Sequence, residues 1–288
     1  MKHIEHIPIV LNQHNIEYMT FRNIGKSSSN TIKKLLYYFE SIKLKKYESN
    51  IYHRNKSLYF TFVSSDDKEF FERVFKNYNT KLIPIGADIN IDESIKEISN
   101  TKTNIVFIGN MSYTPNIEGI KWFYKNVWKL ILEKKSNCKL YIVGKNPTQE
   151  IRALQSDNII VTGTVDRIQP YLEKADIFIV PLISGGGVKV KLIEALANNQ
   201  LVISTSKGIE GTLFKDKQHL FVEDLPERFA ERCIDALENK MKYKDIILNA
   251  KNMVIENYLW SSICEDYNNY LSKVKDSYNK SEDAINEN

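Results

Sequence analysis

Residues 176–197 read DIFIVPLISGGGVKVKLIEALA, and this stretch decides the fold that the sequence predicts. Its opening apolar run, Asp176–Pro181, predicts a short, buried parallel strand. Glycines occupy residues 185–187, and apolar residues then recur at helical spacing up to Ala197. A strand, a glycine loop and a helix in this order turn backbone N–H groups and the positive end of the helix dipole towards an anion. The stretch therefore predicts an anion-binding loop at the end of a strand.

Charged residues at the start of this helix favour a nucleotide as the anion. Lys189 and Lys191 lie at the positive end of the helix dipole, where a lysine is unfavourable unless it has an anionic partner. Glu194 lies three residues after Lys191 and on the same face of the helix. Its carboxylate can accept hydrogen bonds from ribose hydroxyls beside a bound phosphate. The alternative is a surface helix with a flexible entry and an incidental ion pair.

The same alternation of strand and helix extends along the middle of the chain. Strands are predicted over residues 104–108, 139–143, 159–162, 176–180, 201–204 and 220–222. Such a pattern predicts a doubly wound parallel sheet, in which ligands bind beyond the carboxyl ends of the strands. Several glycines that follow these strands are expected on this one rim: Gly109, Gly144, Gly163, Gly185, Gly186, Gly187 and Gly211.

The composition narrows the class of protein. The chain of 288 residues is long enough for two domains, and its net charge of +4 is too small to indicate nucleic-acid binding. Its 3 cysteines show neither a disulfide framework nor zinc-ligand spacing, which fits a reducing cytoplasm. A P-loop, a dinucleotide-binding fingerprint and closely spaced histidines are also missing from the sequence. We therefore expect no metal and no bound cofactor, and the chemistry that remains is recognition of a nucleotide diphosphate.

Residues 1–90 contain less regular elements. Strands are predicted at residues 7–12, 58–63 and 81–84, and a long helix at residues 31–54. Lysines outnumber acidic residues in this helix, and apolar residues recur in it at intervals of three and four. A basic amphipathic helix can lie on anionic lipid. Residues 31–56 are therefore a candidate contact with the inner face of a membrane, and an ordinary solvated helix face is the alternative.

Five segments between Ile105 and Gly211 resemble a known family in order and spacing. They read FIGNMSYTPNIEGIKWF, LYIVGKNP, VTGTVDRIQPYLEKADIFIVPL, GGGVKVKLIEALANNQLVIST and GIEG. Together they resemble the donor-binding half of retaining glycosyltransferases of the GT-B fold, of the family-four type (glycosyl transferases group 1). The resemblance implies two Rossmann-type doubly wound parallel sheets, the N-terminal one incomplete. It implies these domains: an acceptor-side domain at 1–90, a donor-binding domain at 103–257, a returning helix at 258–274 and a disordered tail at 275–288.

The resemblance also implies roles for individual residues. Donor binding is expected from Gly109, Asn110, Gly144, Val165, Gly185, Gly186, Gly187, Lys189, Lys191, Glu194, Glu210 and Gly211. Within this set Glu194 is expected to hold the ribose and Val165 the nucleobase. Catalytic roles are expected for Lys191, near the diphosphate, and for His14, which follows an acceptor-domain strand.

The family pattern is not matched everywhere. Gly186 stands where many members carry a glutamate, Asn110 and Met111 stand where many place a basic residue, and the chain begins inside the acceptor domain. The expected function is transfer of a sugar, with retention, from a nucleotide sugar to a polysaccharide or lipid-linked acceptor in surface polysaccharide biosynthesis. The alternative is an inactive nucleotide-sugar-binding module, either a truncated product or a subunit whose partner chain supplies the missing half of the acceptor domain.

Overall fold

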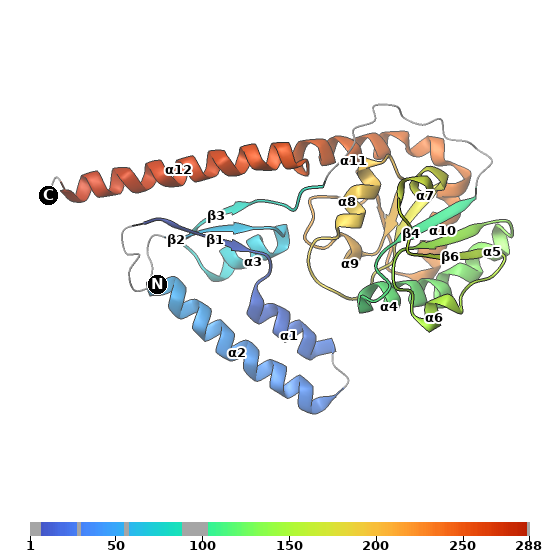
Figure 1. Ribbon diagram of the computed structural model, residues 1–288, viewed down its shortest axis with the longest axis horizontal. Coiled ribbons are helices and arrows are strands. Elements are labelled where there is room, and N and C mark those ends of the chain that lie inside the picture. Colours follow the sequence, from blue (N-terminus) through green and yellow to red (C-terminus); the bar gives the residue numbers. More distant parts are fainter. Residues whose placement is uncertain (1–6, 28–29, 55–57, 88–102, 287–288) are drawn as a thin grey trace. The chain divides into compact units, whose positions relative to one another are not determined.

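The computed structural model describes residues 7–27, 30–54, 58–87 and 103–286 (Figure 1). Contacts within the chain divide it into two units. The first unit comprises residues 1–85, 186–188 and 261–288, and the second comprises residues 86–185 and 189–260. Each unit contains one parallel β-sheet.

The sheet of the first unit has three parallel strands in the order β1-β2-β3. They span Ile9–Gln13 (β1), Leu58–Phe62 (β2) and Asn79–Leu82 (β3). An aromatic cluster forms around the central strand: Phe60 and Phe62 are fully buried, and the tilted ring of Phe71 lies 4.5 Å and 5.0 Å from their ring centroids. Tyr52 adds an edge-on contact with Phe60 at 5.0 Å.

Two helices between β1 and β2 form a hairpin. They are α1 (Glu17–Ser27) and α2 (Thr31–Arg54), and they lie side by side (Figure 1). The sequence predicted α2 at its observed bounds. It gave no prediction of a helix at the position of α1. After β2, helix α3 (Ser65–Val74) begins at Ser64, whose hydroxyl accepts a hydrogen bond of 3.3 Å from the Asp67 N–H.

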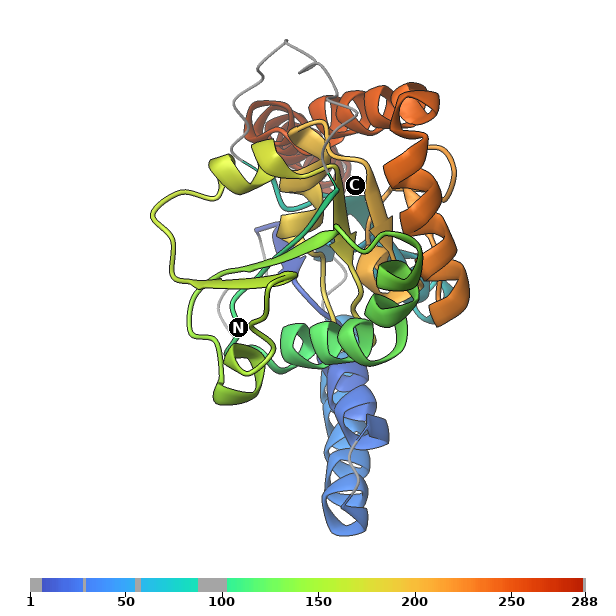
Figure 2. The same cartoon turned by 90° about the vertical axis from the view of Figure 1, so that its right-hand side faces the viewer.

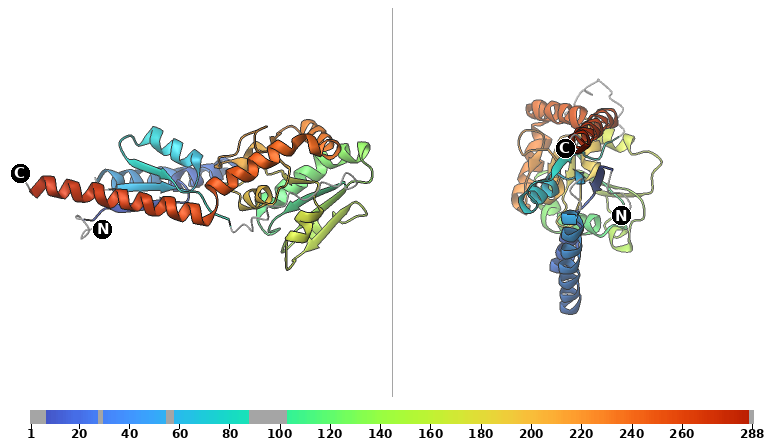
Figure 3. Two further views of the ribbon diagram at one scale, coloured as in Figure 1. Left: turned by 90° about the horizontal axis from the view of Figure 1, so that it is seen from above. Right: turned by 90° about the vertical axis from the view of Figure 1, so that its left-hand side faces the viewer.

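The C-terminal helix also contacts the three-stranded sheet. This helix, α12 (Trp260–Asn286), runs alongside the strands in Figure 3. The Tyr270 hydroxyl donates to the Phe60 carbonyl oxygen at 3.5 Å, and Lys81 forms an ion pair of 2.8 Å with Asp266. The sequence was expected to become disordered from residue 275, whereas in the structure the helix continues to Asn286.

The sheet of the second unit has six parallel strands in the order β6-β5-β4-β7-β8-β9. They span Asn104–Ile108 (β4), Lys139–Val143 (β5), Ile159–Gly163 (β6), Ile177–Val180 (β7), Val202–Ser204 (β8) and Phe221–Val222 (β9). Strand order reverses between β4 and β7, as in doubly wound folds. The prediction of two parallel sheets is therefore confirmed.

Helices cover both faces of the six-stranded sheet (Figure 2). One face is covered by α4 (Thr114–Phe123), a π-helical segment (Tyr124–Trp128), α5 (Lys129–Lys134) and α10 (Pro226–Glu238). The other is covered by α7 (Gln169–Lys174), α8 (Val190–Ala197) and α11 (Lys244–Asn257). Short helical segments complete the unit: α6 (Gln149–Arg152), α9 (Ser206–Ile209) and a 3₁₀ turn (Lys240–Tyr243). Val106 and Phe107 point to opposite faces of β4 and both are fully buried, which explains the continuous apolar character of the strand.

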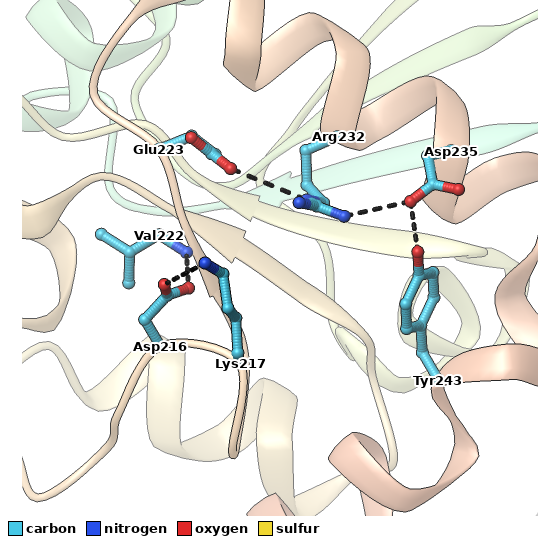
Figure 4. Close-up of polar contacts among 7 residues, drawn as sticks. All are labelled: Asp216, Lys217, Val222, Glu223, Arg232, Asp235 and Tyr243. Carbon is cyan, nitrogen blue, oxygen red and sulfur yellow. Dashed lines mark hydrogen bonds and ion pairs between the residues drawn. The ribbon is translucent and has the colours of Figure 1, made fainter.

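A polar network fixes α10 against β9 and the 3₁₀ turn (Figure 4). The Arg232 guanidinium lies 3.0 Å from Asp235 and 3.7 Å from Glu223, and it stacks 4.3 Å from the Phe221 ring centroid. The Tyr243 hydroxyl donates to the same Asp235 carboxylate, and this bond helps to hold the pKa of Asp235 below its usual value against the opposing effect of burial. The network therefore links α10 to the end of β9 and to the 3₁₀ turn.

Candidate functional site

The candidate site lies at the carboxyl ends of β4 and β7, where the order of the six-stranded sheet reverses. In doubly wound sheets the loops after two such strands diverge to opposite faces and leave a crevice for a ligand. Here the loop after β4 leads into α4, and the loop after β7 leads into α8.

Glycines in the loops after β4 and β5 pack directly against each other. The Gly109 N–H donates to the Val143 carbonyl oxygen at 2.9 Å, and the Met111 N–H donates to the Lys145 carbonyl oxygen at 2.8 Å. Gly144 has a φ of +145°, and a Cβ added there would lie 1.8 Å from the Gly109 carbonyl oxygen. Glycine at position 144 is therefore required by contact between two loops, which is a different reason from the close approach of a ligand that the sequence suggested.

Asn116 joins the loop after β4 to the start of α8. Its side chain is buried, with only 5% exposed. The Nδ2 group donates to the Asn110 carbonyl oxygen at 2.8 Å, and Oδ1 accepts a hydrogen bond of 2.5 Å from the Lys191 ammonium. A Cβ at Gly109 would lie 2.7 Å from Asn116 Nδ2 and 3.0 Å from Lys191 Nζ. Gly109 thus makes room for this pair of side chains.

The Lys191 ammonium lies in an environment that does not compensate its charge. Its hydrogen-bond partner Asn116 is neutral, and Nζ lies 4.2 Å from the centroid of the Phe107 ring. Burial, together with repulsion from Lys189, lowers the pKa of Lys191 to about 7. An anion bound beside Nζ would restore the ordinary preference for the charged form.

Lys189 lies at the N-terminal end of α8 and is only 7% exposed. Burial and the nearby Lys207 lower its pKa, while the Glu210 carboxylate acts in the opposite direction. Glu210 forms an ion pair of 2.5 Å with Lys207. The rim therefore concentrates lysine ammonium groups, and Glu210 balances part of their charge.

Glu194 lies on the first turns of α8 and is half-buried. Burial raises the pKa of its carboxyl group. A partly desolvated carboxylate gains most when hydroxyl or N–H donors satisfy it. The position therefore suits hydrogen bonds to the hydroxyl groups of a ligand.

The remaining predicted residues are placed as follows. Gly185 has a φ of +93° and a Cβ there would lie 2.9 Å from the Pro115 ring, so the loop after β7 packs on the loop after β4. Val165 follows β6, the edge strand, and Gly211 follows α9 with a φ of +78°. The rim of the second unit thus brings together the residues Gly109, Asn110, Gly144, Gly185, Lys189, Lys191 and Glu194.

Three predicted residues belong to the first unit. His14 is exposed and directly follows β1. Gly186 and Gly187 also group with the first unit, and Gly187 has a φ of +72°. Their relation to the rim stays a prediction.

Asn116 is the residue of this site that the sequence analysis missed. The sequence predicts a helix that begins at Asn116 and gives the residue itself no role in binding. The available signal was an amide side chain within the otherwise apolar face of α4, next to Pro115. A buried polar side chain in such a place must find hydrogen-bond partners, and these partners are the loops of the site.

Clusters of metal ligands and membrane-spanning helices are absent from the part of the chain that the structure describes. Within residues 7–27, 30–54, 58–87 and 103–286, no three His, Cys, Asp or Glu side chains gather in a way that could hold a metal ion. Across the same ranges, no helix combines the length and apolar character needed to cross a membrane.

Comparison with known proteins finds one matching family model and two relatives among the similar proteins. The family model described as glycosyl transferases group 1 matches residues 102–239. An uncharacterised 44.6 kDa protein in the cps region of Klebsiella pneumoniae is 26% identical over 260 residues, which cover 86% of this chain and 64% of that protein. An uncharacterised glycosyltransferase of Methanocaldococcus jannaschii is 26% identical over 245 residues, 76% of this chain and 59% of its own length. The chain thus spans about 64% of the first relative and 59% of the second.

Solved structures share the fold. TarM, studied from S. aureus, superposes with a TM-score of 0.62 at 18% identity, over 79% of this chain and 45% of TarM. HepE from Anabaena, in complex with UDP and glucose, superposes with a TM-score of 0.61 at 15% identity, over 92% of this chain and 71% of HepE. Identities this low support a common architecture and not a common substrate.

The packing of the two glycine loops predicts the cost of adding a methyl group. Gly144→Ala should destabilise the second unit by roughly 3 kcal/mol or more, because the new Cβ meets backbone that cannot rotate away. Gly163→Ala is the matched control, since Gly163 also has a positive φ (+70°) but no atom lies within 4 Å of an added Cβ. Its cost should be about 1–2 kcal/mol, the penalty of the left-handed conformation alone. Urea denaturation measures both, and equal losses would contradict the packing argument.

The buried Lys191 ammonium predicts a pH-dependent stability. Its pKa is about 7 in the folded chain against an ordinary 10.5, so the unfolded chain binds more protons between these values. The resulting penalty is complete at and below pH 7 and disappears as the pH rises towards 10.5. Lys191→Met should therefore raise the melting temperature of the ligand-free protein at pH 7 and have little effect near pH 10. Lys125→Met, at an exposed position, is the control and should change neither value. A Lys191→Met variant that is no more stable at pH 7 would refute the buried charge.

Proposed function

We propose that this chain belongs to the glycosyl transferases group 1 family, whose model matches residues 102–239, and that its six-stranded sheet binds the diphosphate of a nucleotide sugar. The observation that carries the proposal is the Lys191 ammonium, held by neutral Asn116 at the switch point of the sheet. A diphosphate is the anion that best fits a buried lysine beside a second lysine at the beginning of a helix. HepE was solved with UDP and glucose, which supports a nucleotide sugar as the ligand class.

Individual residues have distinct roles in this proposal. Lys191 and Lys189 bind the phosphates, and the loops at Gly109, Asn110, Gly144 and Gly185 shape their surroundings. Glu194 accepts hydrogen bonds from ribose hydroxyls, and Val165 contacts the nucleobase. Gly186, Gly187, Glu210 and Gly211 complete the donor contacts.

The proposed reaction is transfer of the sugar from this donor to a polysaccharide or lipid-linked acceptor, with retention of configuration. The bond that breaks joins the anomeric carbon to the diphosphate, and negative charge then develops on the departing oxygen. Lysine ammonium groups and the N-terminal end of α8 stabilise that charge, so the chain needs no metal for this step. His14 is the proposed catalytic residue of the first unit, beside the acceptor.

A second candidate is a donor-binding module without transferase activity. The residues proposed to bind the diphosphate and ribose lie in the second unit, whereas transfer also needs groups that orient an acceptor hydroxyl. Donor hydrolysis or transfer by the purified chain favours the enzyme, and nucleotide binding without either reaction favours the module. A partner chain that restores transfer would identify a divided enzyme. A cytoplasmic location fits both candidates.

The donor site predicts separate losses for two substitutions. Glu194→Gln should weaken binding of a nucleoside and of its diphosphate alike, by about fivefold to tenfold, because a charge-assisted hydrogen bond of about 1.5–3 kcal/mol is replaced by a neutral one of about 0.5–1.5 kcal/mol. Lys191→Met should weaken the diphosphate at least about tenfold and leave the nucleoside unchanged. Calorimetric titration of the uridine, adenosine, guanosine and thymidine series measures both.

Glu231→Gln provides the matched control for this titration. Glu231 is exposed on α10, away from the loops of the site, and its substitution should leave every affinity unchanged. Equal losses of nucleoside and diphosphate in Lys191→Met would remove the phosphate contact from the proposal. Unchanged affinity in a folded Glu194→Gln variant would remove the ribose contact.

A further inference from the structure

Helix α2 has two apolar faces, and among residues 7–27, 30–54, 58–87 and 103–286 only one of them finds packing partners. Along the inner face, Tyr37, Leu44 and Tyr52 are half-buried or buried, and the Tyr37 ring contacts the ring of Phe21 of α1 in a tilted arrangement, with centroids 5.9 Å apart. The outer stripe is defined by five side chains with these exposed fractions: Ile32 73%, Leu35 56%, Leu36 60%, Phe39 52% and Ile42 47%. They recur at intervals of three and four, so they form one continuous strip on the first three turns of the helix. A contiguous apolar surface of this kind commonly marks an interaction site.

Positive charge accompanies the outer stripe. Six basic and two acidic residues give α2 a net charge of +4, which equals the net charge of the whole chain. Lys43 and Lys46 are exposed and lie one turn beyond Phe39 and Ile42, on the same side of the helix. Glu48, one of the two acids, lies against α1, and burial together with the nearby Glu17 raises its pKa to about 7. Glu40, the other acid, forms an ion pair of 2.7 Å with Lys43, so the excess charge beside the stripe is positive and part of it is paired.

The ends of α1 and α2 also enclose a cavity of about 370 Å³. Arg22, Lys26 and Lys34 line it together with Leu35 and Tyr38. Cations around an apolar cavity suit a phosphate group that is attached to an apolar chain. The cavity adjoins the outer stripe through Leu35, which contributes to both.

A second copy of the chain, a nucleic acid and an anionic bilayer match the outer stripe, the positive charge and the cavity to different degrees. Two copies of α2 paired through their stripes would place charges of +4 against each other, which opposes association. A nucleic acid would match the charge but not an apolar stripe. An anionic bilayer matches both, since each lysine near its surface contributes about 1 kcal/mol and apolar side chains enter the headgroup boundary.

We propose that the outer stripe and its neighbouring lysines dock the first unit on a membrane that contains anionic phospholipid. Residues 31–46 make the contact, and the second half of α2, around Tyr52, stays packed in the aromatic cluster. The proposal goes beyond donor binding and does not depend on it, because each of these residues lies in the first unit.

Co-sedimentation with vesicles tests the apolar stripe. The probes are phosphatidylcholine vesicles with and without phosphatidylglycerol, and the variant is Leu35→Gln with Phe39→Gln. Wild type should bind the anionic vesicles, and the variant should bind them at least about tenfold more weakly. Leu225→Gln with Met241→Gln removes two side chains of similar exposure (58% and 53%) from the second unit and should bind as wild type.

The charge requirement is tested separately. Lys43→Glu with Lys46→Glu should reduce binding to anionic vesicles at least about tenfold, and moderate salt should reduce wild-type binding steeply. Lys125→Glu with Lys129→Glu makes the same change of charge on exposed positions of the second unit and serves as control. All variants should keep the circular dichroism and nucleotide affinity of the wild type, so failure of docking is distinguishable from failure of the donor site.

Several results would overturn docking. The first is that the protein binds neither kind of vesicle, and the second is that it binds neutral and anionic vesicles equally. The third is that Leu35→Gln with Phe39→Gln leaves binding unchanged. Concentration-dependent dimerisation that Leu35→Gln with Phe39→Gln abolishes would instead assign the stripe to a second copy. Binding to RNA in place of vesicles would assign the charge to a nucleic acid.

Discussion

The hydrogen bond between the Lys191 ammonium and the Asn116 side chain connects the parts of the candidate site. Asn116 also holds the Asn110 carbonyl, so one amide fixes both the loop after β4 and the beginning of α8. Gly109 is a glycine because this pair occupies the space that a Cβ would need, and Gly144 is a glycine because Gly109 lies against it. The loops after three strands are therefore placed by contacts that converge on one lysine.

This arrangement has an energetic cost that makes sense only with a ligand. A buried ammonium with a neutral partner destabilises the ligand-free fold, as the lowered pKa of Lys191 shows. An apolar residue of similar size would pack there without that penalty. The proposed diphosphate supplies the missing negative charge, so the free energy lost on folding is recovered on binding. Stability and affinity are in opposition at this position.

The sequence predicted the larger sheet well because its strands are buried on both faces. Runs such as Asn104–Ile108 and Lys139–Val143 have no competing interpretation once a helix follows each of them, and their observed bounds agree with the prediction. It did not reveal α1, and it gave no indication of the π-helical segment between α4 and α5. Side-chain contacts between distant segments decide such details.

The role of Asn116 was hidden for the same reason, because its partners Asn110 and Lys191 are 6 and 75 residues away. For α2 the spacing showed apolar stripes, but spacing alone does not tell which stripe is packed.

We expect Lys191 to be largely neutral at pH 8 in the ligand-free chain and to become charged when a diphosphate binds. Calorimetric titration of a nucleoside diphosphate at pH 8, in buffers with different ionisation enthalpies, measures the protons exchanged. The phosphates of the ligand are already fully ionised at that pH, so they contribute none. With a free pKa of about 7, Lys191 should take up close to one proton on binding the diphosphate, and none on binding the nucleoside. Diphosphate binding without proton uptake, or the same uptake with the nucleoside, would contradict the account.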